Sequence, residues 1–252
     1  MRTTVVAAVS AAFQFRQYTA PQRLLRNIRR GQFTRLVASL HPRCHQGPNK
    51  TALNRYPEIF AAAAAAAPNA QRILSFGCST GEECVTLANY FPDAQIVGTD
   101  INPLNLLKAR KHRSERVRFV YAGDRFLCGF GGFDAVFCMA VLRTWKRKRV
   151  AEFYPFDRFA ERAQFLESLV RPGGLLVIHA ATYRFADMMH KCAYETIPVT
   201  AFQETKVYLP DGVTEAIPEG CIFRKLKPDA LASLRQKARL LAEARLPQQV
   251  AA

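Results

Sequence analysis

Two glycines and two acids stand close together in the stretch ILSFGCSTGEE, residues 73–83. Gly77 and Gly81 allow the backbone to turn sharply and to approach a ligand closely. Ser79 or Thr80 can cap a following helix, whose free N–H groups favour an anionic group. A turn of this kind, placed between an apolar run and a helical run, is typical of a ligand-binding connection in an α/β sheet.

A carboxylate stands at a second position suited to ligand binding, because Asp100 ends the apolar run AQIVGTD, 19 residues past Gly81. It can accept two hydrogen bonds from a ribose diol, each worth roughly 1.5–3 kcal/mol because the acceptor is charged. The turn lacks the G-x-G-x-x-G spacing of dinucleotide sites and the Gly-Lys-Ser/Thr of phosphate loops. Glu82 and Glu83 follow it instead, and these acids suit a ligand with a positive amino group and no phosphates. The residues therefore predict a nucleoside-type ligand that carries an amine.

Alternating strands and helices are expected to position these residues. The apolar runs predict strands over 72–76, 94–100, 117–124, 133–142 and 175–183, and helices over 56–68, 81–91, 103–112 and 157–170. This alternation predicts an α/β fold, with a parallel sheet covered by helices on both faces. Two further strands around a turn are expected over 206–226, and a helix over 228–245.

The N-terminal part of the chain is basic. Residues 1–50 contain nine Lys or Arg and no Asp or Glu, within a chain of formal net charge +16. Apolar spacings from Pro21 to Leu40 predict two short amphipathic helices interrupted by Gly31. We therefore divide the chain into a basic helical segment, 1–70, and a ligand-binding domain, 71–252.

Four ordered motifs between residues 71 and 182 resemble those of class I S-adenosylmethionine-dependent methyltransferases. GCSTGEE is similar to the first motif of the chemotaxis-receptor glutamate methyltransferases, and IVGTDIN fits their second. FDAVFCMAVL resembles their fourth-strand motif, and LVRPGGLLVI matches the usual lead into the fifth strand. The resemblance implies a Rossmann-like class I methyltransferase sheet, with S-adenosylmethionine (SAM) as the cofactor that donates the methyl group.

The resemblance also implies which residues hold the methionine portion of SAM. Gly77, Cys78, Ser79 and Gly81 would line that portion of the ligand. Glu82 would reach its amino group.

For the adenosine portion, the resemblance implies that Asp100 holds the ribose hydroxyls. Ile101 and Asn102 would lie beside the adenine. Asp124, expected at the end of the third strand, would meet the adenine amino group, and Arg125 or Phe126 would pack near the ring.

The sequence departs from the chemotaxis enzymes where the acceptor would bind. Cys138 and Met139 would approach the sulfonium and the acceptor, but Met139-Ala140 stand where the chemotaxis enzymes have Arg-Asn. RTW (143–145) replaces their Ile-Tyr-Phe, and Cys84-Val85 replaces their Pro-Tyr. We therefore expect a different acceptor from the glutamates of chemoreceptors, and a small molecule is favoured.

Two residues after the fifth strand are candidates for catalysis. His179 lies near the end of that strand, within reach of a ligand, and can act as a general base. The alternative is a histidine bonded inside the core. Tyr183 follows on the same rim and can contact the acceptor, or it can simply anchor the loop.

A basic run, RTWKRKR (143–149), follows the fourth strand. Its cations can hold an anionic acceptor, with Trp145 as a stacking surface, or they can form a solvated helix start. Together with residues 1–50 it also leaves open a nucleic-acid partner, as in an RNA-binding protein or an RNA methyltransferase. A non-catalytic SAM-binding protein is a third alternative.

The cysteines, the length of the apolar runs and the histidines indicate the cellular compartment and whether a metal site is expected. The seven cysteines are an odd and scattered set, which favours free thiols and a cytoplasmic location over a disulfide framework. No apolar run approaches the roughly 18 residues that span a membrane. His41, Cys44 and His45 have no matching partner cluster, so no metal site is predicted. An acid-free, Arg-bearing start also resembles an organelle transit peptide, which we treat as a minor alternative.

Overall fold

The computed structural model describes residues 44–45, 50–121, 123–144, 146–188, 193–200, 206–218 and 220–228. The two helices expected between residues 21 and 40 lie outside the described residues. So do almost all of the basic segment 1–50 and of the helix expected over 228–245. Within the described residues, no helix is both long enough and apolar enough to cross a membrane.

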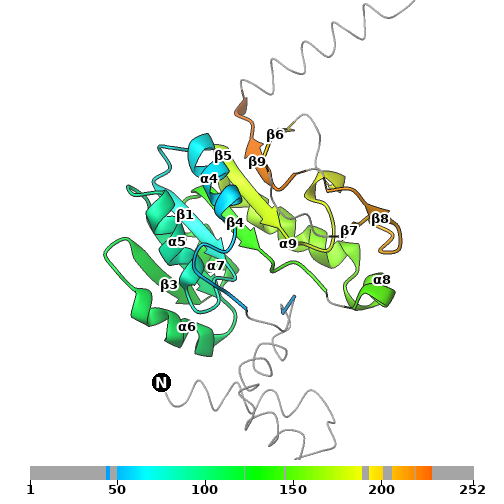
Figure 1. Ribbon diagram of the computed structural model, residues 1–252, viewed down its shortest axis with the longest axis horizontal. Helices are drawn as coiled ribbons and strands as arrows, with labels where there is room; N and C mark the ends of the chain where they lie inside the picture. The colour runs from blue at the N-terminus through cyan, green and yellow to red at the C-terminus, as the bar shows by residue number, and fades with distance from the viewer. Residues whose placement is uncertain are drawn as a thin grey trace, which may run out of the picture.

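A seven-stranded sheet forms the centre of the molecule, in the order β3-β2-β1-β4-β5-β9-β6 (Figure 1). Its strands are β1 (Arg72–Phe76), β2 (Gln95–Asp100), β3 (Val117–Tyr121), β4 (Phe133–Met139), β5 (Val170–His179), β6 (Tyr194–Ile197) and β9 (Ile222–Lys225). The strands from β3 to β5 pair in parallel, whereas β9 runs antiparallel to both β5 and β6. A separate two-stranded sheet pairs β7 (Val207–Tyr208) with β8 (Glu215–Ala216).

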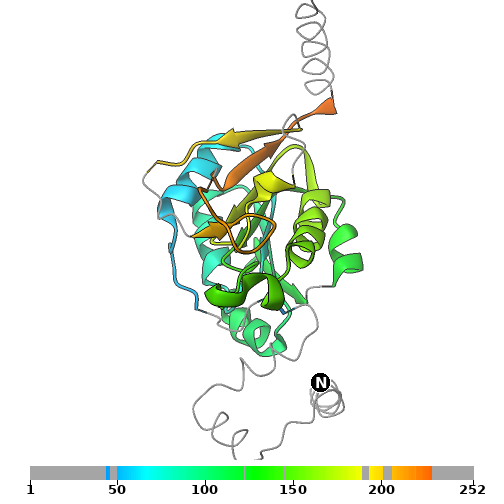
Figure 2. The same ribbon diagram turned by 90° about the vertical axis from the view of Figure 1, so that its right-hand side faces the viewer.

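Helices cover both faces of this sheet. One layer contains α4 (Pro57–Ala66), α5 (Glu82–Tyr90) and α6 (Pro103–Ala109), and the other contains α7 (Asp124–Cys128), α8 (Val150–Phe153) and α9 (Phe156–Ser168). Figure 2 shows α4 and α5, in blue to cyan, on one side of the sheet and α9 on the other. Short 3-10 turns complete the connections: η1 (Arg110–His112), η2 (Arg147–Arg149) and η3 (Phe185–Asp187). The predicted Rossmann-like α/β fold is confirmed.

Each face of the sheet has its own hydrophobic core, because neighbouring side chains of a strand point to opposite faces. On β1, Ile73 packs with Leu87 in the α4–α5 layer, whereas Leu74 packs with Phe159 in the α9 layer. Phe60 of α4 is 1% exposed and belongs to the same core as α5. The alanine-rich helix therefore packs onto the sheet, although the sequence places it in the N-terminal segment 1–70.

Several expected strand boundaries are wrong, and the fourth and fifth strands end at Met139 and His179, before the expected positions 142 and 183. The third strand ends at Tyr121, so Asp124 opens helix α7 and does not end a strand. The fifth strand begins at Val170, so the glycines of RPGG lie inside β5. A Cβ on Gly174 would stand 2.8 Å from the carbonyl oxygen of Asp134, where the β4–β5 register shifts. These glycines therefore allow a close approach of two backbones within the strand pair and do not mark a turn.

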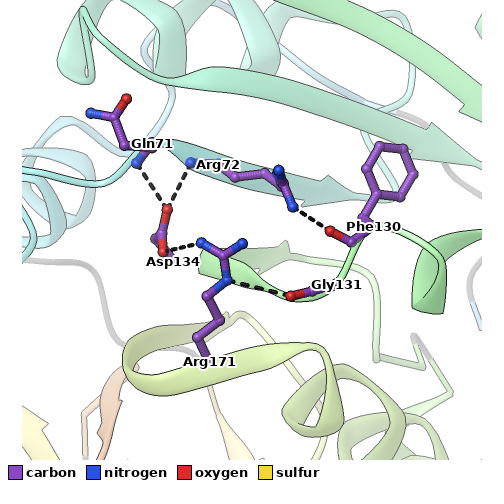
Figure 3. A network of polar contacts seen from close by, with 6 residues as sticks. All are labelled: Gln71, Arg72, Phe130, Gly131, Asp134 and Arg171. Carbon is purple, nitrogen blue, oxygen red and sulfur yellow. Dashed lines mark hydrogen bonds and ion pairs between the residues drawn. The ribbon is translucent and has the colours of Figure 1, made fainter.

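An ion-pair network fastens the amino-terminal ends of β1 and β4, at the opposite edge from the glycine turn (Figure 3). Asp134 Oδ2 accepts the backbone N–H groups of Gln71 at 2.9 Å and Arg72 at 2.8 Å. Arg171 Nη1 donates to Asp134 Oδ1 at 2.9 Å, and the Arg72 side chain donates to the carbonyl oxygen of Phe130. Burial alone would raise the pKa of Asp134, but these three donors outweigh it and hold that pKa below its usual value.

The Asp134→Ala variant is therefore expected to lose about 2 kcal/mol of unfolding free energy at pH 7, because two backbone donors and Arg171 lose their acceptor. The native pKa is lowered, so this stabilisation is present above the unfolded value and disappears as the pH falls through the native pKa. Urea unfolding should show the gap between variant and parent closing at about pH 3. Asp93→Ala, a change at an exposed turn, is the matched control. A gap that is equal at both pH values would contradict the ionic origin of the effect.

Candidate functional site

The glycine turn connects β1 to α5 at the carboxyl edge of the sheet. Gly77, Ser79 and Gly81 all adopt positive φ angles, of 77°, 51° and 97°. A Cβ on Gly77 would stand 2.5 Å from Val141 Cγ2, and one on Gly81 would stand 2.9 Å from Phe119. Both glycines are therefore required by backbone conformation and by space. The turn is therefore tightly packed against Val141 and Phe119.

Asp100 joins this turn to the end of β2. Its Oδ2 accepts the backbone N–H of Ser79 at 3.0 Å, and its Oδ1 accepts that of Asn102 at 2.7 Å. Asn105 Nδ2 lies 3.5 Å from the same Oδ1. The carboxyl group is buried, and burial raises its pKa against the lowering effect of these donors. An ionised carboxylate has about four acceptor positions, and these three donors leave one of them, on Oδ2, for a ligand hydroxyl.

Residues 101 and 102 follow Asp100 directly. Asn102 caps helix α6, because its Oδ1 accepts the N–H of Leu104 at 3.0 Å, and its side chain is buried. Ile101 remains partly exposed at the same edge. The cap fixes the backbone that leaves β2, so both residues are held beside Asp100, and their contact with the adenine stays a prediction.

The two acids after the turn have different surroundings. Glu82 Oε2 accepts the hydroxyl of Thr80 at 2.6 Å, and its Oε1 lies 3.9 Å from His112 Nε2. Glu83 instead turns toward the sheet, where its Oε1 accepts the hydroxyl of Ser75 at 2.7 Å. Burial raises the pKa of Glu83 to about 7, although the Ser75 bond and the Arg55 charge lower it.

The sequence analysis named both acids as suited to an amine but assigned the amino group of SAM to Glu82 alone, and the structure makes Glu83 a second candidate. A carboxyl group with a raised pKa in a ligand crevice is a functional candidate. The sequence did contain a signal, because Ser75 is a polar residue inside the apolar strand RILSF and a buried hydroxyl needs a partner. Only the angular position of helix α5 against β1 identifies that partner as Glu83.

Asp124 and Arg125 open α7 beyond the end of β3. Asp124 Oδ1 accepts a hydrogen bond from Arg162 Nη1 at 2.9 Å, across to helix α9. Arg125 is exposed, as is its neighbour Phe126, which is 56% exposed and packs edge-on against Phe130 at 5.3 Å. Asp124 therefore has a structural ion pair, and contacts of Asp124 and Arg125 with the adenine stay predictions.

Cys138 and Met139 end β4 next to the turn. Both are buried, and burial raises the pKa of the Cys138 thiol well above its usual value. Cys78 in the turn is also buried, and its pKa is raised, first by a hydrogen bond with Cys84 and then by burial. These thiols are therefore protonated at neutral pH and act as small apolar residues that shape the crevice.

His179 ends β5 and is 5% exposed. Its ring packs edge-on against the ring of Tyr56, with 4.8 Å between centroids. Burial, with smaller contributions from Arg143 and Arg55, lowers the pKa of His179 to about 4. A neutral imidazole at this position can accept a proton, but with such a pKa it is a weak base.

Tyr183 lies on the same rim but faces inward. It is 1% exposed, stacks on Tyr154 at 6.2 Å, and donates its hydroxyl to the carbonyl oxygen of Tyr154 at 2.7 Å. Burial raises its pKa to about 12. The hydroxyl thus has a structural partner, which corresponds to the anchoring alternative. A contact of Tyr183 with the acceptor stays a prediction.

Two cations of the basic run after β4 make contacts within the fold. Lys146 Nζ lies 3.3 Å above the Phe153 ring, and Arg149 pairs with Glu152. Trp145 lies outside the described residues. These contacts stabilise the start of α8, which matches the helix-start alternative, and the comparisons below give no support for a nucleic-acid partner.

His45 and Cys44 pack against the opposite layer. His45 Nδ1 lies 2.6 Å from the Tyr154 hydroxyl, and Arg158 Nη2 donates to the carbonyl oxygen of Cys44 at 2.6 Å. Burial and the charges of Arg158 and Arg162 lower the pKa of His45 to about 3. Among the described residues, no group of three or more His, Cys, Asp or Glu could hold a metal ion.

Comparison with known proteins gives a partial match. Residues 74–176, from β1 to β5, match the family model of a methyltransferase domain. This part of the chain is thus similar to a methyltransferase domain. One relative is a trans-aconitate 2-methyltransferase from Deinococcus radiodurans, 32% identical over 111 residues. That match covers 44% of this chain and 38% of the relative, so it spans less than two fifths of the relative's length.

Solved structures with similar architecture include an O-methyltransferase family protein from Burkholderia thailandensis, with a TM-score of 0.41 and 18% identity. That match covers 54% of this chain and 40% of the other. The SAM-bound amino pentose methyltransferase CalS10 from Micromonospora echinaspora has a TM-score of 0.39 and 19% identity, covering 72% and 80%. At these scores the structures carry no argument about the substrate of this chain.

Proposed function

We propose that this protein transfers a methyl group from SAM to a small-molecule acceptor. The observation that carries the proposal is the pairing of Asp100 with the glycine turn, because one buried carboxylate holds the turn and stands where a sugar hydroxyl would be accepted. The methyltransferase match over residues 74–176 supports the reaction type. SAM supplies an electrophilic methyl group on its sulfonium.

The described residues fit each portion of SAM. In this proposal Asp100 accepts a ribose hydroxyl, with Ile101, Asn102, Asp124 and Arg125 around the adenine. The absence of a side chain at Gly77 lets Val141 pack directly against the turn.

The amino group of SAM is assigned to Glu83, where the sequence alone suggested Glu82. Glu83 faces the sheet and accepts from Ser75, whereas the two oxygens of Glu82 contact Thr80 and His112. An ammonium beside Glu83 would favour its ionised form and offset the cost of its burial. Cys138 and Met139 then border the sulfonium on the side of the acceptor.

Methyl transfer is a direct displacement, so the chain mainly has to align the donor with the acceptor and exclude water. The buried ends of β1, β4 and β5 supply an apolar wall for this purpose. His179 lies at the end of that wall, near the expected place of the acceptor.

Isothermal titration tests the proposal directly. SAM and its product S-adenosylhomocysteine are expected to bind with micromolar affinity, whereas ATP and NAD are expected not to bind, because the turn offers acids where phosphates would lie. Lys206→Ala, which removes an exposed ion pair with Glu215, should leave the affinity unchanged. If the folded protein did not bind SAM at millimolar concentration, the result would contradict the proposal.

A further inference from the structure

A pocket lies at the carboxyl end of β5, on the side of the strand where β9 pairs with it. The N–H of Ile178 donates to the carbonyl oxygen of Cys221, just before β9, at 2.9 Å. The pocket is lined by the end of β5, by η3, by β7 and by the start of β9, and the lining includes Ile178, Ala180, Phe185, Val207, Cys221 and Phe223. Because β5 runs parallel to β1, the pocket lies at the same edge of the sheet as the glycine turn.

The β7–β8 hairpin forms one wall of this pocket. The N–H of Tyr208 donates to the carbonyl oxygen of Thr182 at 2.9 Å, which ties β7 to the chain that follows β5. At the other end of the hairpin, a Cβ on Gly212 would stand 2.8 Å from the Cβ of Ala151, so the hairpin tip packs directly on α8. The hairpin is therefore fastened at both ends, and Val207 of β7 is a fixed part of the pocket wall.

The wall of the pocket is largely apolar. Ile178, Phe185 and Phe223 are each at most 5% exposed, and the rings of the two phenylalanines lie 5.0 Å apart between centroids. Burial raises the pKa of Cys221 to about 12, so its thiol stays protonated and behaves as a small apolar group. His179 also lines the pocket, and its lowered pKa keeps the imidazole neutral.

The charge of Arg184, which also lines the pocket, is already paired. Its Nε donates to both carboxylate oxygens of Asp187 at 3.1 Å, and its Nη1 donates to the carbonyl oxygen of Ile217 at 3.4 Å. An ionised ligand group would therefore lose its water in this pocket without gaining an unpaired counter-charge from the described lining residues. An uncharged group fits the pocket better.

The pocket borders the place proposed for the methyl donor. Met139, which borders the sulfonium in the proposed function, is paired with His179 in the β4–β5 register, and paired strands lie about 4.8 Å apart. Ala140 and Ala180 follow directly, and both have positive φ angles, of 57° and 53°. Such angles are strained for alanine and cluster at functional sites. A ligand group beside Ala180 would thus lie one strand away from the expected position of the sulfonium.

We propose that this pocket holds an uncharged apolar group of the methyl acceptor, such as a branched alkyl group or a single ring, and thereby selects the acceptor. This inference rests on the proposed function and names its substrate class, a small molecule with a compact apolar body. Burial in the pocket removes the apolar surface of that body from water. A ring would also pack against the rings of Phe185 and Phe223. Val207 and Ala186 limit the size of the group, because both line the pocket.

Binding of an uncharged ring tests the pocket without any reaction. Fluorinated benzyl alcohol is expected to bind the full chain with millimolar or tighter affinity, measured by fluorine NMR. Fluorinated benzoate, which adds a charge to the same ring, is expected to bind at least tenfold more weakly. If the alcohol did not bind, or if both probes bound equally well, the result would overturn the inference. This measurement needs no SAM, so its outcome is separate from the test of the proposed function.

Two variants narrow the pocket from different elements. Val207→Phe on β7 and Ala186→Leu on η3 are each expected to weaken binding of the benzyl alcohol at least tenfold, because the larger side chain occupies the space of the ring. The Kd for SAM, measured by titration, should change less than threefold. Val213→Phe is the matched control for Val207→Phe, because Val213 belongs to the same hairpin and is 77% exposed. Unchanged binding in both folded pocket variants would contradict the assignment of this pocket.

A screen with SAM labelled in its methyl group tests the selection of acceptors. Acids, alcohols and amines each enter as a set that shares the reacting group and carries an ethyl, an isopentyl, a phenylethyl or a second ionised group. Within the set that is methylated, kcat/KM is expected to be at least tenfold higher with an apolar body than with an ethyl or ionised one. The Val207→Ala variant enlarges the pocket and should shift the preference toward the larger body, which an unfolded protein cannot do. Equal rates across the set, or a preference for the ionised body, would contradict the inference.

Discussion

The Asp100→Asn variant is expected to bind SAM at least 100-fold more weakly than the parent protein. The substitution keeps the shape of the side chain but replaces one acceptor oxygen by a donor and removes the charge. The carboxylate would otherwise supply a bond to the ribose, worth roughly 1.5–3 kcal/mol. It also accepts the N–H groups of Ser79 and Asn102, so the amide cannot satisfy the turn and the ligand together. Isothermal titration with SAM measures the loss.

The control for this prediction is Asp93→Asn, the same chemical change at an exposed turn between α5 and β2. Its affinity for SAM should equal that of the parent. Circular dichroism should show that both variants keep their secondary structure. If a folded Asp100→Asn variant retained SAM affinity within threefold of the parent, the ribose would have to bind elsewhere.

The Glu83→Gln variant is expected to be more stable than the parent at pH 8 and much weaker in SAM binding. The folded pKa of Glu83, about 7, lies above its model-peptide value of 4.5. Between these two values the folded state binds more protons than the unfolded state, so the unfolding free energy falls as the pH rises. The loss reaches up to about 3 kcal/mol above pH 7. Glutamine has no such titration, and its amide can still accept from Ser75.

Two measurements check this prediction. Chemical unfolding at pH 5 and pH 8 should show the variant gaining stability over the parent only at the higher pH. Titration with SAM should show the affinity of the parent falling as the pH decreases from 7.5 to 5.5, because the free carboxylate becomes protonated. The variant should bind at least tenfold more weakly at pH 7.5 and show a flat profile. The Glu82→Gln variant is the neighbouring control, and an equal effect there would contradict the assignment of the amino group to Glu83.

Burial of these two carboxylates lowers the unfolding free energy of the protein. In the proposed function a bound ligand offsets this cost. Burial raises the pKa of both Asp100 and Glu83, so each carboxyl resists ionisation in the protein alone. A ligand that brings a hydroxyl donor to one and an ammonium to the other relieves both costs. The affinity for SAM and the stability of the protein should therefore rise together at neutral pH.

The alternation of apolar runs and the positions of glycine were sufficient to predict the fold. Strand and helix periodicity depends on local sequence. A strand buried on both faces, such as RILSF, can be recognised from its run of mostly apolar residues. The turn at Gly77 and Gly81 was also predictable, because only glycine readily adopts its backbone angles. Strand ends were less well predicted, since the glycines of RPGG serve a close backbone approach inside β5 that depends on β4.

Side-chain direction was decided only by the tertiary structure. The sequence alone does not show which of Glu82 and Glu83 points toward the sheet. The packing of α5 on β1 turns Glu83 toward Ser75. Likewise, nothing local brings Tyr56 to His179, which lies more than 120 positions away along the chain. The sequence by itself thus determined the sheet, the turn and Asp100, because these follow from backbone conformation and short-range pattern. The acceptor side depends on contacts between distant segments, which exist only once both helical layers have packed on the sheet.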